Sequence, residues 1–191
     1  MTTLGNPLRA AQRGVILVVS LLMLALLTLL SVAMFRGFGL EQRIAGNTRE
    51  KQHAFQAAQS ALQYGEYWLS QGNGTSGAPC ATAPTTLQVC SNPPSVALAT
   101  LSPASSSWAF GASYAPASIG STAPLPVSTA GGVGNYYAAP ELYIYFLGLA
   151  PNGQSRVFQV TSAAAGGNPN AVSIVQSTYS ISTAIKDLGG L

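Results

Sequence analysis

The sequence has very few charged residues, and most of them precede residue 70. Charged side chains make up 7% of the 191 residues. After Ser70 the chain contains only Glu141, Arg156, Lys186 and Asp187, two of each sign, so the formal charge of +3 belongs to the N-terminal third. A basic face neutralises the phosphates of DNA or RNA, and the last two thirds of the chain have too few cations to form one. We therefore expect no nucleic-acid partner.

The sequence also lacks the residue patterns that carry catalysis. His53 is the only histidine, and the five carboxylates are scattered along the chain. Neither paired acids nor the H-E-x-x-H, G-x-S-x-G or phosphate-loop motifs occur. The glycine-rich segment 130–135 (AGGVGN) lacks the lysine of a phosphate loop, and we interpret it as an ordinary loop. We predict that the protein is not an enzyme and binds no cofactor or metal.

Cysteine is scarce as well, with two residues, Cys80 and Cys90, in a stretch rich in Ser, Thr, Ala, Gly and Pro. Neither has a histidine or a further cysteine nearby to complete a metal site. If the segment is exported, a local disulfide is the favoured interpretation. The alternative is a pair of reduced thiols buried as small hydrophobic groups.

One long apolar run is present near the N-terminus. Residues Val15–Phe35 form 21 consecutive positions without a charge. As a helix they would be roughly 32 Å long at ~1.5 Å per residue, which matches a hydrocarbon core of about 30 Å. Arg9 and Arg13 precede the run, so the positive-inside rule predicts a cytoplasmic N-terminus. The rest of the chain would then face the outside of the inner membrane.

A secretory signal peptide cut after Ala33 is the competing interpretation of this run, because Ser31, Val32 and Ala33 resemble a cleavage site. The run is longer than the usual apolar region of a signal peptide, which spans about 7–15 residues. Helical character also resumes at once after it. We therefore favour a retained anchor.

The pattern of residues 36–71 predicts that the same helix continues as an amphipathic helix. Apolar residues recur mostly at three- and four-residue steps, which places them on one face. The residues that we expect to pack on the rest of the protein are Phe55, Ala58, Leu62 and Leu69. Gly72, Asn73 and Gly74 provide a C-terminal stop.

The remainder divides into a loop-rich region at 72–140 and a strand-rich region at 141–187. Frequent prolines exclude a long helix from the first region, where short strands are expected near 87–89 and 107–114. Parts of 115–135 are alternatively disordered. In the second region, 141–149 and 156–163 flank Pro151-Asn152-Gly153 and predict a hairpin, and 171–185 adds a third strand. We expect an α+β fold in which the helix packs on a C-terminal antiparallel sheet.

Three segments in series resemble the N-terminal region of PilX-type minor pilins of the type IV pilus. They are Gln12-Arg13-Gly14 before the apolar run, 40–47 (LEQRIAGN) and 54–58 (AFQAA), and the resemblance covers about residues 12–62. It implies a pilin-like fold. It also implies a cytoplasmic leader at 1–14 that prepilin peptidase removes between Gly14 and Val15, N-methylation of Val15, and an anchor at 15–35.

The resemblance further implies a structural role in pilus assembly. The expected partners are other minor pilins, the major pilin, a tip adhesin, prepilin peptidase, the inner-membrane assembly platform and the lipid bilayer. The subunit would leave the membrane for the pilus with its ectodomain periplasmic or extracellular, and would support assembly priming, adhesion and twitching motility. Two alternatives are a pseudopilin of a type II secretion system and a Sec-cleaved exported binding domain.

Position 19 departs from the wider pilin pattern. Major pilins carry a glutamate at the fifth mature position, thought to pair with the amino terminus of a neighbouring subunit, whereas this chain has Val19. An apolar side chain cannot form that pair. The departure predicts a place at the end of a filament rather than along its shaft.

Overall fold

The computed structural model describes residues 8–80, 83–114, 125–132, 134–151 and 153–182. The chain divides into two compact units, Met1–Gly46 and Asn47–Leu191. One helix, α1 (Leu8–Trp68), belongs to both units. The predicted ends of the third strand at 185 and of the strand-rich region at 187 lie outside the described residues, as does much of the segment 115–135 weighed as disordered.

The first unit consists of the N-terminal part of α1. Every large apolar side chain between Val15 and Phe35 is exposed, with fractions from 49% at Val19 to 75% at Phe35. Ser20, Thr28 and Ser31 interrupt the apolar run, and their hydroxyls donate to the carbonyls of Leu17, Ala25 and Leu27 within the helix. These bonds satisfy the hydroxyl donors without water, as a hydrocarbon environment requires.

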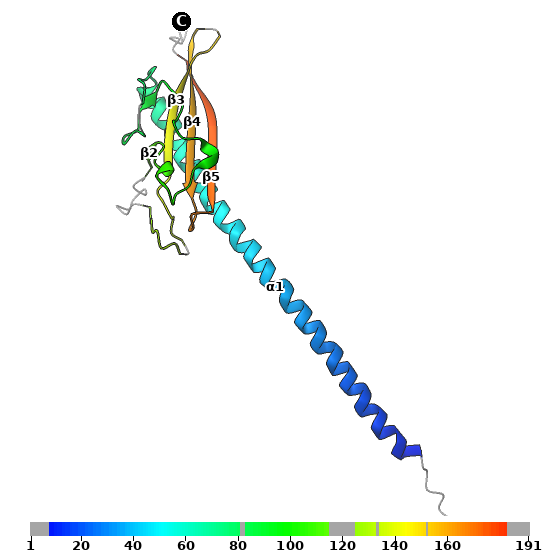
Figure 1. The fold of residues 1–191 in the computed structure, drawn as a ribbon. Helices are drawn as coiled ribbons and strands as arrows, with labels where there is room; N and C mark the ends of the chain where they lie inside the picture. Colours follow the sequence, from blue (N-terminus) through cyan, green and yellow to red (C-terminus); the bar gives the residue numbers. More distant parts are fainter. Residues whose placement is uncertain (1–7, 81–82, 115–124, 133, 152, 183–191) are drawn as a thin grey trace, which may run out of the picture. The chain divides into compact units, whose positions relative to one another are not determined.

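In the second unit, the described residues form one mixed sheet beside the C-terminal part of α1 (Figure 1). Its strands are β1 (Val89–Cys90), β2 (Ala112–Ser113), β3 (Glu141–Leu149), β4 (Ser155–Ala165) and β5 (Val172–Ser182). The strands β3, β4 and β5 form the expected antiparallel meander.

One edge of the sheet carries two short strands whose pairing was not predicted. β1 pairs parallel with β3 through Val89↔Ile144 and Cys90↔Tyr145, while β2 pairs antiparallel with β3 through Ala112↔Leu142 and Ser113↔Glu141. The predicted strand near 107–114 is also shorter than expected, because a 3-10 turn occupies Ser106–Trp108. Two short segments of the loop-rich region thus share the outer edge of β3.

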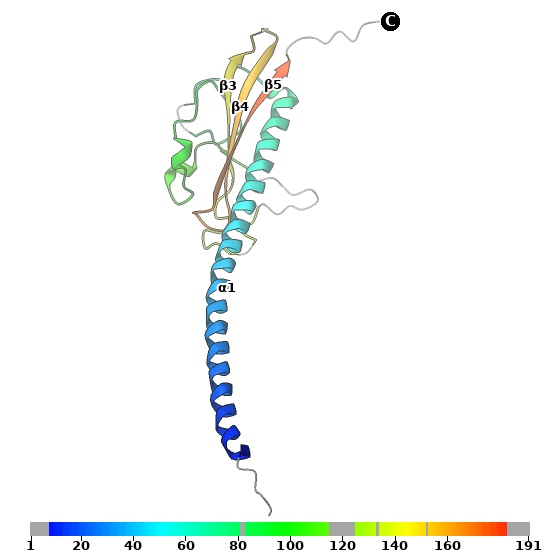
Figure 2. The ribbon, with the colours of Figure 1, turned by 90° about the vertical axis from the view of Figure 1, so that its right-hand side faces the viewer.

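The sheet has the helix on one face and the loop-rich region on the other, as Figures 1 and 2 show for this unit. Side chains alternate between the two faces of a strand. On the helix side, Leu142, Ile144, Phe158 and Val160 form a core with Leu69. On the loop side, Tyr143 and Ala163 pack with loop residues, which are Cys90, Leu101, Trp108 and Phe110. The helix, the sheet and the loop-rich region thus form three layers, which bury both faces of the sheet.

The helix contacts the sheet mainly through small residues. Ala54, Ala57, Ala58 and Ala61 are buried. A Cβ atom added at Gly65 would lie 3.0 Å from Val160 Cγ1 and 3.1 Å from Leu142 Cδ2. The sheet supplies the large side chains and the helix supplies the space for them, so the backbone of α1 can approach closely.

The structure corrects one of the four predicted packing residues. Ala58 and Leu69 are fully buried and Leu62 packs partly against the helix-side core, but the Phe55 side chain is 44% exposed. Phe55 lies next to the stripe of alanines rather than within it. At 3.6 residues per turn, Phe55 is rotated by about 100° around the helix from the buried Ala54, so its side chain lies at the border of the covered face.

Candidate functional site

The candidate site for membrane insertion and subunit contact is the exposed N-terminal part of α1. Within the described residues, α1 is a helix long and apolar enough to cross a membrane. Gly14, Val15 and Val19 all lie in the helix, and a Cβ atom at Gly14 would meet nothing within 4 Å. The structure leaves the apolar side chains of this segment without a cover from their own unit. Lipid, or apolar helices of other subunits, would bury them favourably.

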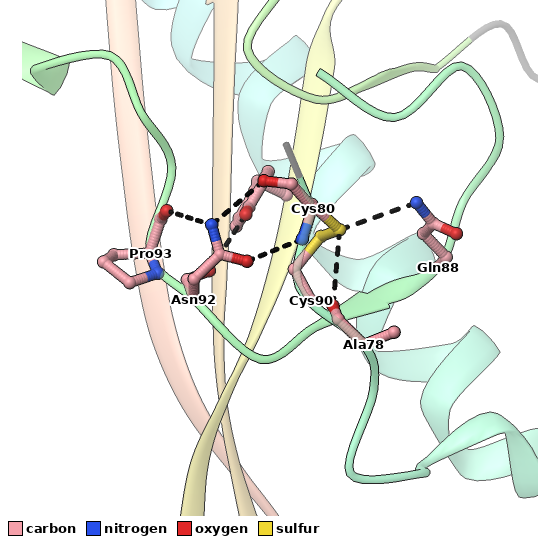
Figure 3. The surroundings of a disulfide bond; sticks show 7 residues. Ala78, Cys80, Gln88, Cys90, Asn92 and Pro93 are labelled. Carbon is pink, nitrogen blue, oxygen red and sulfur yellow. Dashed lines mark hydrogen bonds between the residues drawn. A yellow bond between two sulfur atoms is a disulfide. The ribbon is translucent and has the colours of Figure 1, made fainter. Parts of the chain in front are cut away.

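A disulfide joins Cys80 to Cys90, the pairing that their spacing favoured (Figure 3). The two Cα atoms are 5.5 Å apart and the residues are 10 positions apart. Since Cys90 is the second residue of β1, the bond attaches the start of the loop-rich region to the edge of the sheet.

Asn92 reinforces this connection, a role that the sequence did not indicate. Its Oδ1 accepts a hydrogen bond from the Cys80 amide at 2.7 Å, and its Nδ2 donates to the Cys80 carbonyl at 3.0 Å, as Figure 3 shows. The Tyr143 hydroxyl donates to the Asn92 carbonyl at 2.9 Å. Burial, with a smaller contribution from Tyr145, raises the pKa of the Tyr143 phenol, so it remains a donor at neutral pH. Asn92 thus links the disulfide loop to β3.

The part of α1 at the start of the second unit, around Glu50 and Lys51, is fixed to the connection between β4 and β5. The Glu50 carboxylate accepts a hydrogen bond from the Gly167 amide, and Lys51 Nζ donates to the Val172 carbonyl at 2.8 Å. A Cβ atom at Gly166 would lie 2.6 Å from the Glu50 carbonyl oxygen. Farther along, the Ser177 hydroxyl donates to Glu66 Oε1 at 2.6 Å. These polar contacts flank the stripe of alanines and set the position of the helix along the sheet.

His53 is half-buried and stacks on Tyr136, with ring centroids 4.2 Å apart. It borders a hollow of about 180 Å³ lined by Arg49, Glu50, Gln52, Gln56 and Gly134. Pockets for small organic ligands usually measure about 300–1,000 Å³. Among the described residues, no group of three or more His, Cys, Asp or Glu side chains could hold a metal ion. This arrangement fits a packing contact between the helix and a loop.

The start of β3 carries a buried acid that sequence reasoning missed. Glu141 is 5% exposed, and its Oε1 accepts a hydrogen bond from the Ser113 hydroxyl at 2.6 Å. Its Oε2 is buried and has no hydrogen-bond partner among the described residues. Burial raises the pKa of this carboxyl to about 7, while Ser113 and the Gly111 backbone act in the opposite direction. The only sequence signal was a lone acid at the head of an apolar strand.

Two family models match the chain. The model described as PilX N-terminal matches residues 13–63, and the model described as type IV pilus assembly protein PilX C-term matches residues 56–181. No curated protein and no solved structure matches the chain. The two matches together span both units, including the apolar part of α1 and all five strands. The chain therefore belongs to the PilX family of type IV pilus assembly proteins, whose members are minor pilins.

Proposed function

We propose that this minor pilin primes assembly of the type IV pilus from the inner membrane and then occupies a position at the filament tip. In this role it associates with other minor pilins and with the major pilin, and it supports the adhesin at the tip. Pilus-dependent adhesion and twitching motility then depend on it indirectly. The proposal extends the family membership, which by itself establishes association with pilins.

The observation that carries the proposal is the difference in side-chain burial between the two parts of α1. From Val15 to Phe35 the apolar side chains are exposed, whereas from Ala54 onward the small apolar residues are buried against the sheet. A helix that is apolar all round requires lipid or other helices around it. Such a segment can be held by a bilayer before assembly and by neighbouring pilin helices afterwards.

Processing and orientation are parts of the same proposal. Prepilin peptidase cuts between Gly14 and Val15 on the cytoplasmic side, and the new amino terminus of Val15 is methylated. Removal of residues 1–14 also removes Arg9 and Arg13, the cations that precede the apolar run. The mature subunit can then leave the bilayer without carrying those charges through it.

The tip position follows from Val19. A glutamate at this position would need the amino terminus of a neighbouring subunit as its cationic partner inside an apolar environment, and Val19 requires no such partner. A subunit that begins a filament has no earlier subunit with which to form the pair. Replacing Val19 with Glu should therefore reduce incorporation of this subunit, and unchanged incorporation and pilus number would contradict the tip position.

Deletion of the gene, followed by complementation, tests the function. We expect the deletion strain to have few or no pili and to regain them with the wild-type chain. Immunoprecipitation of the wild-type chain from detergent-solubilised membranes should recover other minor pilins. Normal pilus number in the deletion strain, with a loss of protein secretion instead, would replace the proposal with a role in a secretion pseudopilus.

A further inference from the structure

The proposed role in pilus assembly depends on the apolar part of α1 and does not account for the buried Glu141 carboxyl. It lies on the loop side of β3, because the next residue, Leu142, packs on the helix side with Gly65. Opposite it on β4 is Ala163, and opposite it on β2 is Ser113. A carboxyl in this place exchanges water for the Ser113 hydroxyl and the Gly111 backbone, and Oε2 is left without a partner. An ionised carboxylate is costly in such surroundings.

No cation among the described residues is placed to compensate that charge. The cluster on the loop face contributes the phenols of Tyr137, Tyr143 and Tyr145. Burial, the Ser113 hydroxyl and the Gly111 backbone are the causes that act on the Glu141 pKa, and none of them is a charged group. On β2 the facing group is the Ser113 hydroxyl, and β4 contributes Ala163. The ionisable groups of α1, such as Glu66, act from the opposite face of the sheet, where Glu66 bonds to Ser177.

Arg156 is the one basic residue of the described strands, and it is far from Glu141. It pairs with Leu149, at the other end of β3, and its guanidinium donates to the Gly74 carbonyl at 2.7 Å. Leu149 lies eight positions after Glu141 in β3, which corresponds to roughly 27 Å at ~3.4 Å per residue. The carboxyl therefore has to be neutral, or has to gain access to water.

The cover over Glu141 is the short strand β2. β2 has two residues, Ala112 and Ser113, and the Ser113 side chain is exposed to solvent. Besides the strand pairing, the Tyr114 amide donates to the Pro140 carbonyl, and Gly111 packs so closely on β3 that an added Cβ atom would clash with the Leu142 carbonyl. On either side of β2, Phe110 is buried in the loop-side core, and Tyr114 is held on α1 by the hydrogen bond between its hydroxyl and Ser60 and by its ring contact with Tyr64. Lifting Ala112 and Ser113 between these two anchors would expose the carboxyl to water.

We propose that Glu141 makes the attachment of β2 to β3 dependent on pH, with the neutral carboxyl keeping β2 closed and the ionised carboxylate opening it. We call Gly111, Ser113 and Glu141 the β2 clasp. The closed clasp binds the proton more tightly than the open one, in which the carboxyl has the usual pKa of an exposed glutamate. Closure is therefore favoured below that usual pKa, weakens as the pH rises, and reaches its minimum above about 7.

Hydrogen exchange measured by mass spectrometry on the full-length protein in detergent micelles tests the clasp. After correction for the pH dependence of intrinsic exchange, protection of the amides of residues 111–114 should fall about tenfold or more between pH 5.5 and 8. Protection of β4 should not change. Equal protection of residues 111–114 at the two pH values in the wild-type protein would overturn the proposal without any variant.

Three variants sharpen this test. Glu141→Gln keeps the size of the side chain and removes its ionisation, so protection should become independent of pH. Ser113→Ala removes a hydrogen bond that lowers the Glu141 pKa, so the fall should move to higher pH. Glu66→Gln is the matched control, since Glu66 also accepts a serine hydroxyl at 2.6 Å, and it should retain the wild-type fall. A pH-dependent fall that persists in Glu141→Gln would contradict the proposal.

Discussion

The two units of this chain obtain their stability from different surroundings. The first unit, up to Gly46, has no buried residue among those that the structure describes, and the side chains of its apolar run are exposed. The second unit, from Asn47, buries apolar residues on both faces of a sheet and is closed by a disulfide. Substitutions in the first unit should therefore change where the protein resides, and substitutions in the second should change how stably it folds.

The largest expected effect comes from charges in the apolar run. Replacing both Leu24 and Leu27 with Arg should weaken membrane insertion by about 6 kcal/mol, because each Arg near the centre of a bilayer costs roughly 3 kcal/mol on an insertion scale. The fraction of the protein that resists alkaline extraction of membranes should fall sharply. The matched control is Ala at both positions, which should remain membrane-bound. If the arginine variant stayed fully in the membrane fraction, the apolar run of the first unit would not be what holds the protein there.

Loss of the disulfide should have the next largest effect, and only on the second unit. Replacing both Cys80 and Cys90 with Ala should lower the free energy of unfolding by about 2–3 kcal/mol, because the bond closes a short loop in the unfolded chain. Chemical denaturation of the full-length protein in detergent micelles, followed by near-ultraviolet circular dichroism, measures this change. Gln88→Ala removes a contact with Cys80 Sγ and keeps the bond, so it serves as the control.

The small residues of α1 provide a comparison within the second unit. Ala58→Leu should lower the free energy of unfolding by about 1–3 kcal/mol, because Ala58 is fully buried against β4 and a larger side chain overpacks the contact. Phe55→Leu should change it by less than about 1 kcal/mol, because the ring is half exposed. The same denaturation measurement applies to both variants. A greater loss from Phe55→Leu than from Ala58→Leu would show that the helix packs through a different face.

The smallest expected effect concerns the polar contact between α1 and β5. Lys51→Met keeps most of the side-chain length and removes the hydrogen bond from Nζ to the Val172 carbonyl. Because Lys51 is exposed, the loss in unfolding free energy should be below about 1 kcal/mol. Thermal unfolding followed by circular dichroism measures it. A loss as large as that of the disulfide variant would assign this contact a much greater role than its exposure indicates.

The sequence predicted the elements whose signals are local. Helical periodicity and the apolar run predicted α1, although the helix begins at Leu8, before the apolar run, and Asn73 caps its end by donating to the Trp68 carbonyl. Alternation and the turn at Pro151 predicted the β3–β4 hairpin, and alternation also predicted β5. Such patterns depend on neighbouring residues only.

Features that depend on distant pairing were not predictable in this way. Nothing near Val89 indicates that it pairs in parallel with Ile144, 55 positions later. The links between Asn92 and Cys80, and between Ser113 and Glu141, also depend on how loops fold back on the sheet. The three- and four-residue steps marked a broad apolar face but not which part of it the sheet would cover, so Phe55 was expected to pack with Ala58.

The most direct test of the central claim is mass spectrometry of the N-terminus of the protein purified from membranes. The claim is that the apolar part of α1 remains in the mature chain and anchors it. We predict a mature chain that begins at methylated Val15 and retains the whole run to Phe35. A mature chain that begins at Met34 would mean that the run is a removed signal peptide, and would contradict both the anchor and the assembly role.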